Sequence, residues 1–146
     1  TPFVASSDDQ TALIRDKKAS GLNWEAWSYD KMKEYKTNHQ LVFIDFTAAW
    51  CLTCQVNKKI ALEHPRVQEK FKAMNVAAFK ADWTNRDDQI TEALARLGKN
   101  SVPVYALHYS SQGQRQQELL PEILTAEIIL NALEKIKQKR SKDREG

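Results

Sequence analysis

The sequence predicts an α/β fold with a central mixed sheet of four to five strands and helices on both of its faces. Short apolar runs at residues 41–47, 76–81 and 102–107 alternate with segments of helical periodicity, an order typical of layered α/β domains. The 146 residues are also long enough to bury the core of one domain. With 42% hydrophobic and 28% charged residues, the composition excludes collagen-like, low-complexity and wholly disordered classes.

The first predicted elements are a surface helix and the central strand. Residues 29–39 are polar around Met32 and Tyr35, which predicts a short surface helix. Residues 41–47 are apolar on both alternating faces, as expected of a strand that is covered on both sides. This strand is therefore placed in the middle of the sheet.

Two helices and a second strand are expected next. No Gly or Pro occurs from Cys54 to Leu62, so a helix should begin near the two cysteines. Pro65 interrupts this helix and suits the first turn of a following one. The apolar residues of that following helix are Val67, Phe71 and Met74. Residues 76–81 then form a second apolar strand.

A further amphipathic helix is predicted after residue 83. Thr84 or Asn85 is expected to cap its start, and Gly98 to end it. Its apolar face consists of Ile90, Ala93, Leu94 and Leu97. This spacing is helical, so the segment links two strands of the sheet.

The last part of the chain predicts a hairpin and a C-terminal helix. Residues 102–107 and 117–120 are the two strands, with Gly113 in the turn between them. Thr125 should cap the last helix. The apolar face of that helix consists of Ile129, Ala132, Leu133 and Ile136.

The predicted domain occupies residues 21–138. Residues 1–20 show weak periodicity and are interpreted as a flexible arm or linker. Residues 139–146 form a basic C-terminal tail, and the net charge of +3 originates near this end of the chain. The tail contains no aromatic residue, and the sequence carries no nucleic-acid-binding signature, so we expect a solvated helix end and no nucleic-acid partner.

The sequence by itself does not state a compartment. Apolar runs such as residues 41–44 are far shorter than the roughly 20 residues of a membrane-spanning helix, and no signal peptide can be identified. The chain begins with Thr1 rather than Met, and its first residues are weakly patterned. These features favour excision from a longer chain.

The pair Cys51 and Cys54 is the candidate chemical centre. Two cysteines are too few for a disulfide framework, and a zinc site would need two further ligands. The histidines at 39, 64 and 108 are scattered over separate elements, so no metal is expected. As a redox pair, Cys51 would be exposed at the helix N-terminus and attack as a thiolate, while Cys54 would face inward and resolve the mixed disulfide. A pair of inert buried thiols is the alternative.

Asp45 is the second candidate residue. Its carboxylate lies within an apolar strand, so burial should raise its pKa. Beneath Cys54, such an acid would accept the proton that the resolving thiol must lose and later return it. The alternative is a purely structural pairing of Asp45 with Lys58 or Lys80.

The segment from Asp45 to Cys54 resembles the thioredoxin superfamily. The acid stands six positions before the first cysteine, Trp50 stands directly before it, and Val102-Pro103 follows well downstream. Three blocks in order, residues 50–54 with Val56-Asn57, residues 80–87 and residues 101–105, look like the C-terminal periplasmic domain of the DsbD family of thiol:disulfide interchange proteins. The resemblance covers residues 22–138 or so.

This resemblance implies a thioredoxin-like fold and a protein-disulfide reductase without cofactor. Such a domain relays electrons from a membrane-embedded partner domain to an N-terminal periplasmic domain of the same longer chain. That second domain serves disulfide isomerisation and cytochrome c maturation. The implied location is the periplasm, the isolated domain should be a monomer, and Val102–Pro103 should be a cis peptide opposite Cys51. Partner contacts are expected from Trp50, Leu52, Val102 and Pro103.

Two positions depart from related patterns. Leu52-Thr53 replaces the Gly-Pro of ordinary thioredoxins, and Lys58 stands where some relatives carry an acid. A cation at position 58 would favour a thiolate.

Two other functions stay open: a stand-alone thioredoxin-like reductase or oxidase, and a non-catalytic thiolate metal-binding module.

Overall fold

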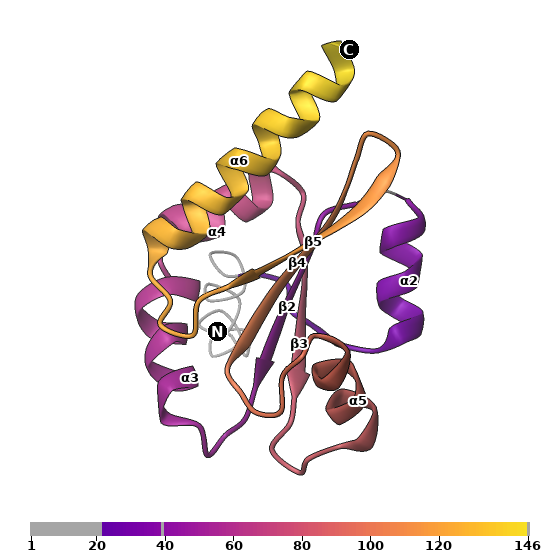
Figure 1. The fold of residues 1–146 in the computed structure, drawn as a ribbon. Helices are drawn as coiled ribbons and strands as arrows, with labels where there is room; N and C mark the ends of the chain where they lie inside the picture. The colour runs from indigo at the N-terminus through magenta and orange to yellow at the C-terminus, as the bar shows by residue number, and fades with distance from the viewer. Residues whose placement is uncertain (1–21, 39, 146) are drawn as a thin grey trace, which may run out of the picture.

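The structure is a computed structural model that describes residues 22–38 and 40–145 (Figure 1). The arm or linker predicted for residues 1–20 lies outside the described residues. Within the described residues, no helix is both long and apolar enough to span a membrane.

The core of the fold is a mixed sheet of five strands in the order β1-β3-β2-β4-β5. Strands β1, β3 and β2 run parallel, β4 is antiparallel to β2, and β5 is antiparallel to β4. The strands are β1 (Glu25–Ala26), β2 (Val42–Thr47), β3 (Ala77–Asp82), β4 (Val104–Ser111) and β5 (Gln114–Leu120). The predicted α/β fold with a mixed sheet is confirmed, and β2 is central, as its two apolar faces indicate.

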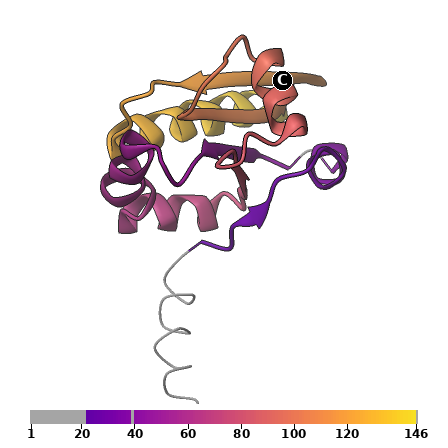
Figure 2. The same cartoon turned by 90° about the horizontal axis from the view of Figure 1, so that it is seen from below.

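Helices cover both faces of this sheet (Figures 1 and 2). One face is covered by α2 (Tyr29–Thr37) and α5 (Asp88–Arg96). The other is covered by α3 (Leu52–Asn57), the π-helical segment η1 (Lys58–Leu62), α4 (Pro65–Ala73) and α6 (Ala126–Glu145). The apolar residues of β2 alternate between the two layers, because successive side chains of a strand point to opposite faces. Phe43 packs with the α4 and α6 side, and Ile44 with the α2 and α5 side.

Several helix and strand boundaries differ from the sequence prediction. The first turn of α5 is capped by Asp87, whose Oδ2 accepts a hydrogen bond from the Ile90 amide at 3.1 Å. The caps predicted at Thr84 and Asn85 are therefore wrong, and the Thr84 side chain bonds Asp82 and the Ala49 amide instead. The edge strand β1 and the π-helical turn of η1 were not predicted, because neither has a local sequence signal.

The C-terminal helix continues past the predicted domain boundary at residue 138. Lys139 Nζ donates a hydrogen bond to the Tyr109 hydroxyl at 3.2 Å. Asp143 accepts hydrogen bonds from Ser111 Oγ at 2.8 Å and from the Gln112 amide at 3.0 Å. The basic residues that follow position 138 thus extend α6 to Glu145, and the helix contacts the β4–β5 hairpin along this part.

Candidate active site

The two cysteines lie where the chain passes from the central strand into a helix. Cys51 is the N-cap of α3, four residues after β2 ends at Thr47, and Cys54 lies in the first turn. The two residues form a disulfide, with their Cα atoms 5.2 Å apart. The Cys54 amide donates a hydrogen bond to Cys51 Sγ at 3.2 Å.

This position favours a negatively charged sulfur at Cys51. The first backbone N–H groups of a helix have no partner within the helix, and they make its N-terminus electropositive. The Cys54 amide already points at Cys51 Sγ and would stabilise the thiolate when the disulfide is reduced. The local geometry therefore favours attack by Cys51.

Cys51 is more buried than the sequence predicts, whereas Cys54 is buried as predicted. Cys51 is 7% exposed and Cys54 is 3% exposed. The two cysteines pack with Ala48 and with the half-buried Val102. The predicted exposure of Cys51 is therefore wrong for the disulfide form, because neighbouring side chains cover it. Cys54 is still the more deeply buried of the two.

The Val102–Pro103 peptide lies next to the disulfide. This bond is cis, which confirms the expectation from the family resemblance. Pro103 is buried, and Val102 contacts the cysteine cluster. The partner-binding role of these two residues stays a prediction.

Exposed apolar side chains flank Cys51 in the sequence and continue along α3 and η1, and another lies in the segment that Asn57 binds. We call these five residues the apolar rim: Trp50, Leu52, Val56, Ile60 and Ile123. Leu52 is 78% exposed and Trp50 is 48% exposed, so both side chains are accessible to another protein. Large exposed apolar side chains in one area are typical of interaction sites.

Trp50 is held in place by the loop after β3. Its Nε1 donates a hydrogen bond to the Thr84 carbonyl at 3.0 Å, and the Ala49 amide donates to Thr84 Oγ1 at 2.8 Å. The Arg86 guanidinium lies 5.0 Å from the centre of the Trp50 ring. These contacts fix the segment that leads into Cys51. Sequence reasoning missed Arg86, although residues 80–87 form one of the blocks on which the family resemblance rests.

Asp45 is buried in β2 on the side of the sheet that α3 and η1 cover. Asp45 is only 5% exposed, and its Oδ1 has no hydrogen-bond partner in the described part of the chain. Burial raises the pKa of this carboxyl group to about 7, against the opposing effect of the positive charges of Lys80 and Lys58. The predicted direction of the pKa shift therefore agrees with the structure.

A cavity of about 730 Å³ connects Asp45 with the two lysines. Lys58 lines this cavity and follows Cys54 by one helical turn. The cavity therefore reaches the active-site helix. With a pKa near neutral, Asp45 has both protonation states available for proton exchange at pH 7. Its role as the proton acceptor for Cys54 stays a prediction.

Asn57 anchors the active-site helix to the rest of the domain. This residue is 2% exposed, and its Nδ2 donates to the Tyr105 hydroxyl at 2.9 Å and to the Glu122 carbonyl at 2.7 Å. Its Oδ1 accepts from the Leu124 amide at 3.2 Å. Asn57 was named only as part of a motif, although its spacing from the inward-facing Cys54 places it near the buried side of the helix.

A disulfide that opens a helix directly after the central strand of a mixed α/β sheet defines a class of thiol–disulfide oxidoreductases. Residues 23–108 match a family described as thioredoxin-like, and the chain belongs to this family. It is a thioredoxin-like thiol–disulfide oxidoreductase with Cys51 and Cys54 as its redox pair. The predicted thioredoxin-like fold is confirmed.

Similar solved structures include thioredoxins and DsbD domains. A thioredoxin from Thermus thermophilus has a TM-score of 0.64 and 16% identity over 80% of this chain and 87% of that chain. The oxidised C-terminal domain of Neisseria meningitidis DsbD has a TM-score of 0.54 and 23% identity over 90% and 97%. A Trichomonas vaginalis thioredoxin has a TM-score of 0.55 and 21% identity over 80% and 98%. These likenesses show the fold. In a separate comparison, no curated protein matches the sequence.

Among the described residues, no group of three or more His, Cys, Asp and Glu side chains is arranged to hold a metal ion.

Proposed function

We propose that this chain is an electron-relay domain of the DsbD type. It would accept two electrons from a membrane-embedded partner domain and pass them to an N-terminal periplasmic partner domain. Both partners would belong to the same longer protein, and the site would work in the periplasm. The downstream processes would be disulfide isomerisation and cytochrome c maturation.

The apolar rim is the observation that carries this proposal. A relay domain must dock transiently on folded proteins so that its sulfur reaches another disulfide. The exposed Leu52, Val56 and Ile60 follow each other at helical spacing beside Cys51, and they offer a continuous apolar contact. The three DsbD-like sequence blocks and the DsbD domains among the similar structures support the same proposal.

The reductive half of the relay starts from the disulfide form. A thiolate of the electron donor attacks Cys51 Sγ, the bond between Cys51 and Cys54 breaks, and Cys54 leaves as a thiolate. Asp45 in its protonated form gives its proton to this sulfur. The second donor thiolate then attacks the mixed disulfide, so that the donor is oxidised and this chain is reduced.

The second half passes the same two electrons onward. The Cys51 thiolate attacks the disulfide of the acceptor and forms a new mixed disulfide. The Asp45 carboxylate removes the proton of Cys54, and the Cys54 thiolate attacks Cys51 Sγ. The acceptor leaves as a dithiol, and the disulfide of this chain is restored.

Trapping the mixed disulfide tests the proposed partner. The Cys54→Ser variant is reduced and mixed with the oxidised N-terminal periplasmic domain of a DsbD-type protein. We expect a stable 1:1 mixed disulfide through Cys51, and none with the Cys51→Ser variant as the matched control. Preferential capture of unfolded secretory proteins would favour an oxidase instead. Equal reaction with an unrelated folded disulfide protein would contradict a relay.

A further inference from the structure

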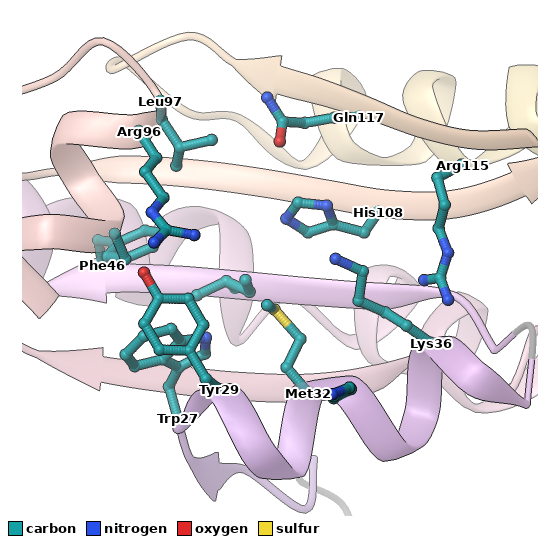
Figure 3. A pocket seen from close by; sticks show the side chains of 13 residues that line it. Trp27, Tyr29, Met32, Lys36, Phe46, Arg96, Leu97, His108, Arg115 and Gln117 are labelled. Carbon is teal, nitrogen blue, oxygen red and sulfur yellow. The ribbon is translucent and has the colours of Figure 1, made fainter. Parts of the chain in front are cut away.

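A pocket of about 440 Å³ lies on the face of the sheet opposite to the active-site helix (Figure 3). It opens between α2, α5 and the β4–β5 hairpin. Pockets of roughly 300–1,000 Å³ are the size that holds small organic ligands. The redox mechanism uses none of the residues that line this pocket.

The inner wall of the pocket is apolar. We call this wall the apolar floor, and its residues are Trp27, Met32, Ile44, Phe46, Ala93 and Leu97. Trp27, Met32, Ile44 and Phe46 also belong to the buried core on this side of the sheet. A ligand with an apolar body would cover the apolar surface that this floor still exposes, which is favourable by roughly 25 cal/mol for each Å².

The charged residues that line this pocket are all positive. Lys33 and Lys36 come from α2, Arg96 from α5 and Arg115 from β5, whereas no Asp or Glu is among the described lining residues. Arg96 is already paired with Glu92 at 3.1 Å and lies over the Tyr29 ring. The remaining three cations therefore produce a positive potential that a bound anion would neutralise.

His108 of β4 lines this pocket near Lys36 and Arg115 (Figure 3). Burial, with smaller contributions from the charges of Lys36 and Arg115, lowers the pKa of His108 to about 4. The imidazole is consequently neutral at pH 7 and has one N–H to donate. Burial and Arg115 also lower the pKa of Lys36. Burial is the largest cause of both shifts, and the charge contributions arise because positive groups face each other in this pocket.

Two buried hydrogen-bond donors in the same wall have no partner in the described part of the chain. They are Trp27 Nε1 and the Tyr29 hydroxyl. Buried donors nearly always have a partner in folded proteins. A ligand that carries an acceptor group would supply a hydrogen-bond partner for Trp27 Nε1 or the Tyr29 hydroxyl after a small movement of that side chain.

We propose that this pocket binds a small amphipathic organic anion. Its apolar body packs on the apolar floor, and its carboxylate, sulfonate or phosphate group lies among Lys36, His108 and Arg115. A hydrated inorganic anion fits less well, because it would leave the apolar floor uncovered. A neutral apolar molecule also fits less well, because it would leave the cations without a counter-charge.

NMR titration of the 146-residue chain tests this site with three probes. These are naphthalene-2-sulfonate, the neutral alcohol 2-naphthalenemethanol, and inorganic sulfate. We expect the sulfonate to bind at least tenfold more tightly than either control probe. It should shift the ring protons of His108 and the indole N–H of Trp27.

Charge-removing variants locate the bound anion. Lys36→Gln and Arg115→Gln should each weaken sulfonate binding several-fold and leave binding of the neutral alcohol unchanged. Lys135→Gln removes the same charge from the exposed side of α6 and should change neither. Equal affinity for the alcohol and the sulfonate, shifts confined to the apolar rim, or no binding at millimolar sulfonate would each overturn the proposal.

Discussion

The guanidinium of Arg86 lies 5.0 Å from the centre of the Trp50 ring and 4.9 Å from the centre of the Trp83 ring. Trp50 is the residue directly before Cys51, and its indole N–H is also bonded to the Thr84 carbonyl. The loop after β3 therefore fixes one side of the disulfide. The position of Trp50, the aromatic member of the apolar rim, depends on this loop.

Replacing Arg86 with Gln should affect protein substrates more than small ones. Each exposed cation–π contact contributes roughly 0.5–1 kcal/mol, so Trp50 should become more mobile while the fold is retained. We expect reduction of the disulfide by a protein dithiol to slow several-fold in stopped-flow fluorescence, with little change for dithiothreitol. Arg66→Gln, an exposed change on α4, is the control. Equal slowing with both reductants would contradict this docking role.

Replacing Asn57 with Ala should destabilise the domain by about 2–4 kcal/mol. The change leaves the Glu122 carbonyl and the Leu124 amide without their partner, and an unsatisfied buried polar group costs about 1–3 kcal/mol. Tyr105→Phe removes only the bond between the hydroxyl and Asn57, so it should cost about 1 kcal/mol. Urea unfolding of the oxidised proteins measures both values. Similar losses in the two variants would show that Asn57 is not the main anchor.

Asp45 should make the folded chain less stable as the pH rises. Its pKa is about 7 in the folded chain and near 3.8 when unfolded, so the folded chain binds more protons between these values. This contribution to stability is complete below about pH 4 and is lost as the pH rises through 7. The full difference amounts to about 4 kcal/mol.

The Asp45→Asn variant isolates this effect because Asn cannot ionise. Relative to wild type, its unfolding free energy should increase between about pH 4 and pH 8 by up to about 4 kcal/mol. His108 acts oppositely, because its lowered pKa reduces stability as the pH falls below 6.5, but both proteins share this change. Urea unfolding across this pH range provides the comparison. Parallel profiles for the two proteins would rule out the raised pKa of Asp45.

Lys58 should tune the proton affinity of Asp45. The positive charge of Lys58 lowers the pKa of the carboxyl group, so Lys58→Glu should raise that pKa above its wild-type value. A ¹³C NMR titration of the Asp45 carboxyl carbon measures the change directly. Lys59→Glu makes the same charge change one residue away and should have a smaller effect. An equal shift in both variants would indicate a general charge effect and no specific contact.

The central part of the fold follows from local patterns. Residues 41–47 are apolar on both faces, and only a strand buried between two layers satisfies such a pattern. The next helix is likewise marked by the absence of Gly and Pro after the cysteines. In contrast, β1 has only two residues, and it forms through pairing with β3, which no local pattern encodes.

The candidate site was partly predictable for a related reason. Cys51, Cys54 and Asp45 have distinctive chemistry or an unusual setting, so sequence spacing is enough to select them. Arg86 has a backbone φ of +52°, and its guanidinium lies over the Trp50 and Trp83 rings. The fold creates both features, so the sequence pattern does not reveal them. The packing of Val102 against Cys51 likewise depends on a distant segment, which is why the exposure of Cys51 was overestimated.

Selective alkylation of the reduced chain distinguishes the two sulfurs. The reduced protein is treated with a limiting amount of iodoacetamide near neutral pH, and mass spectrometry measures modification at each cysteine. Because Cys51 caps the helix and is the less buried of the two residues, we expect its thiol to react at least tenfold faster than that of Cys54. Equal rates, or faster reaction at Cys54, would contradict the assignment of Cys51 as the attacking thiol.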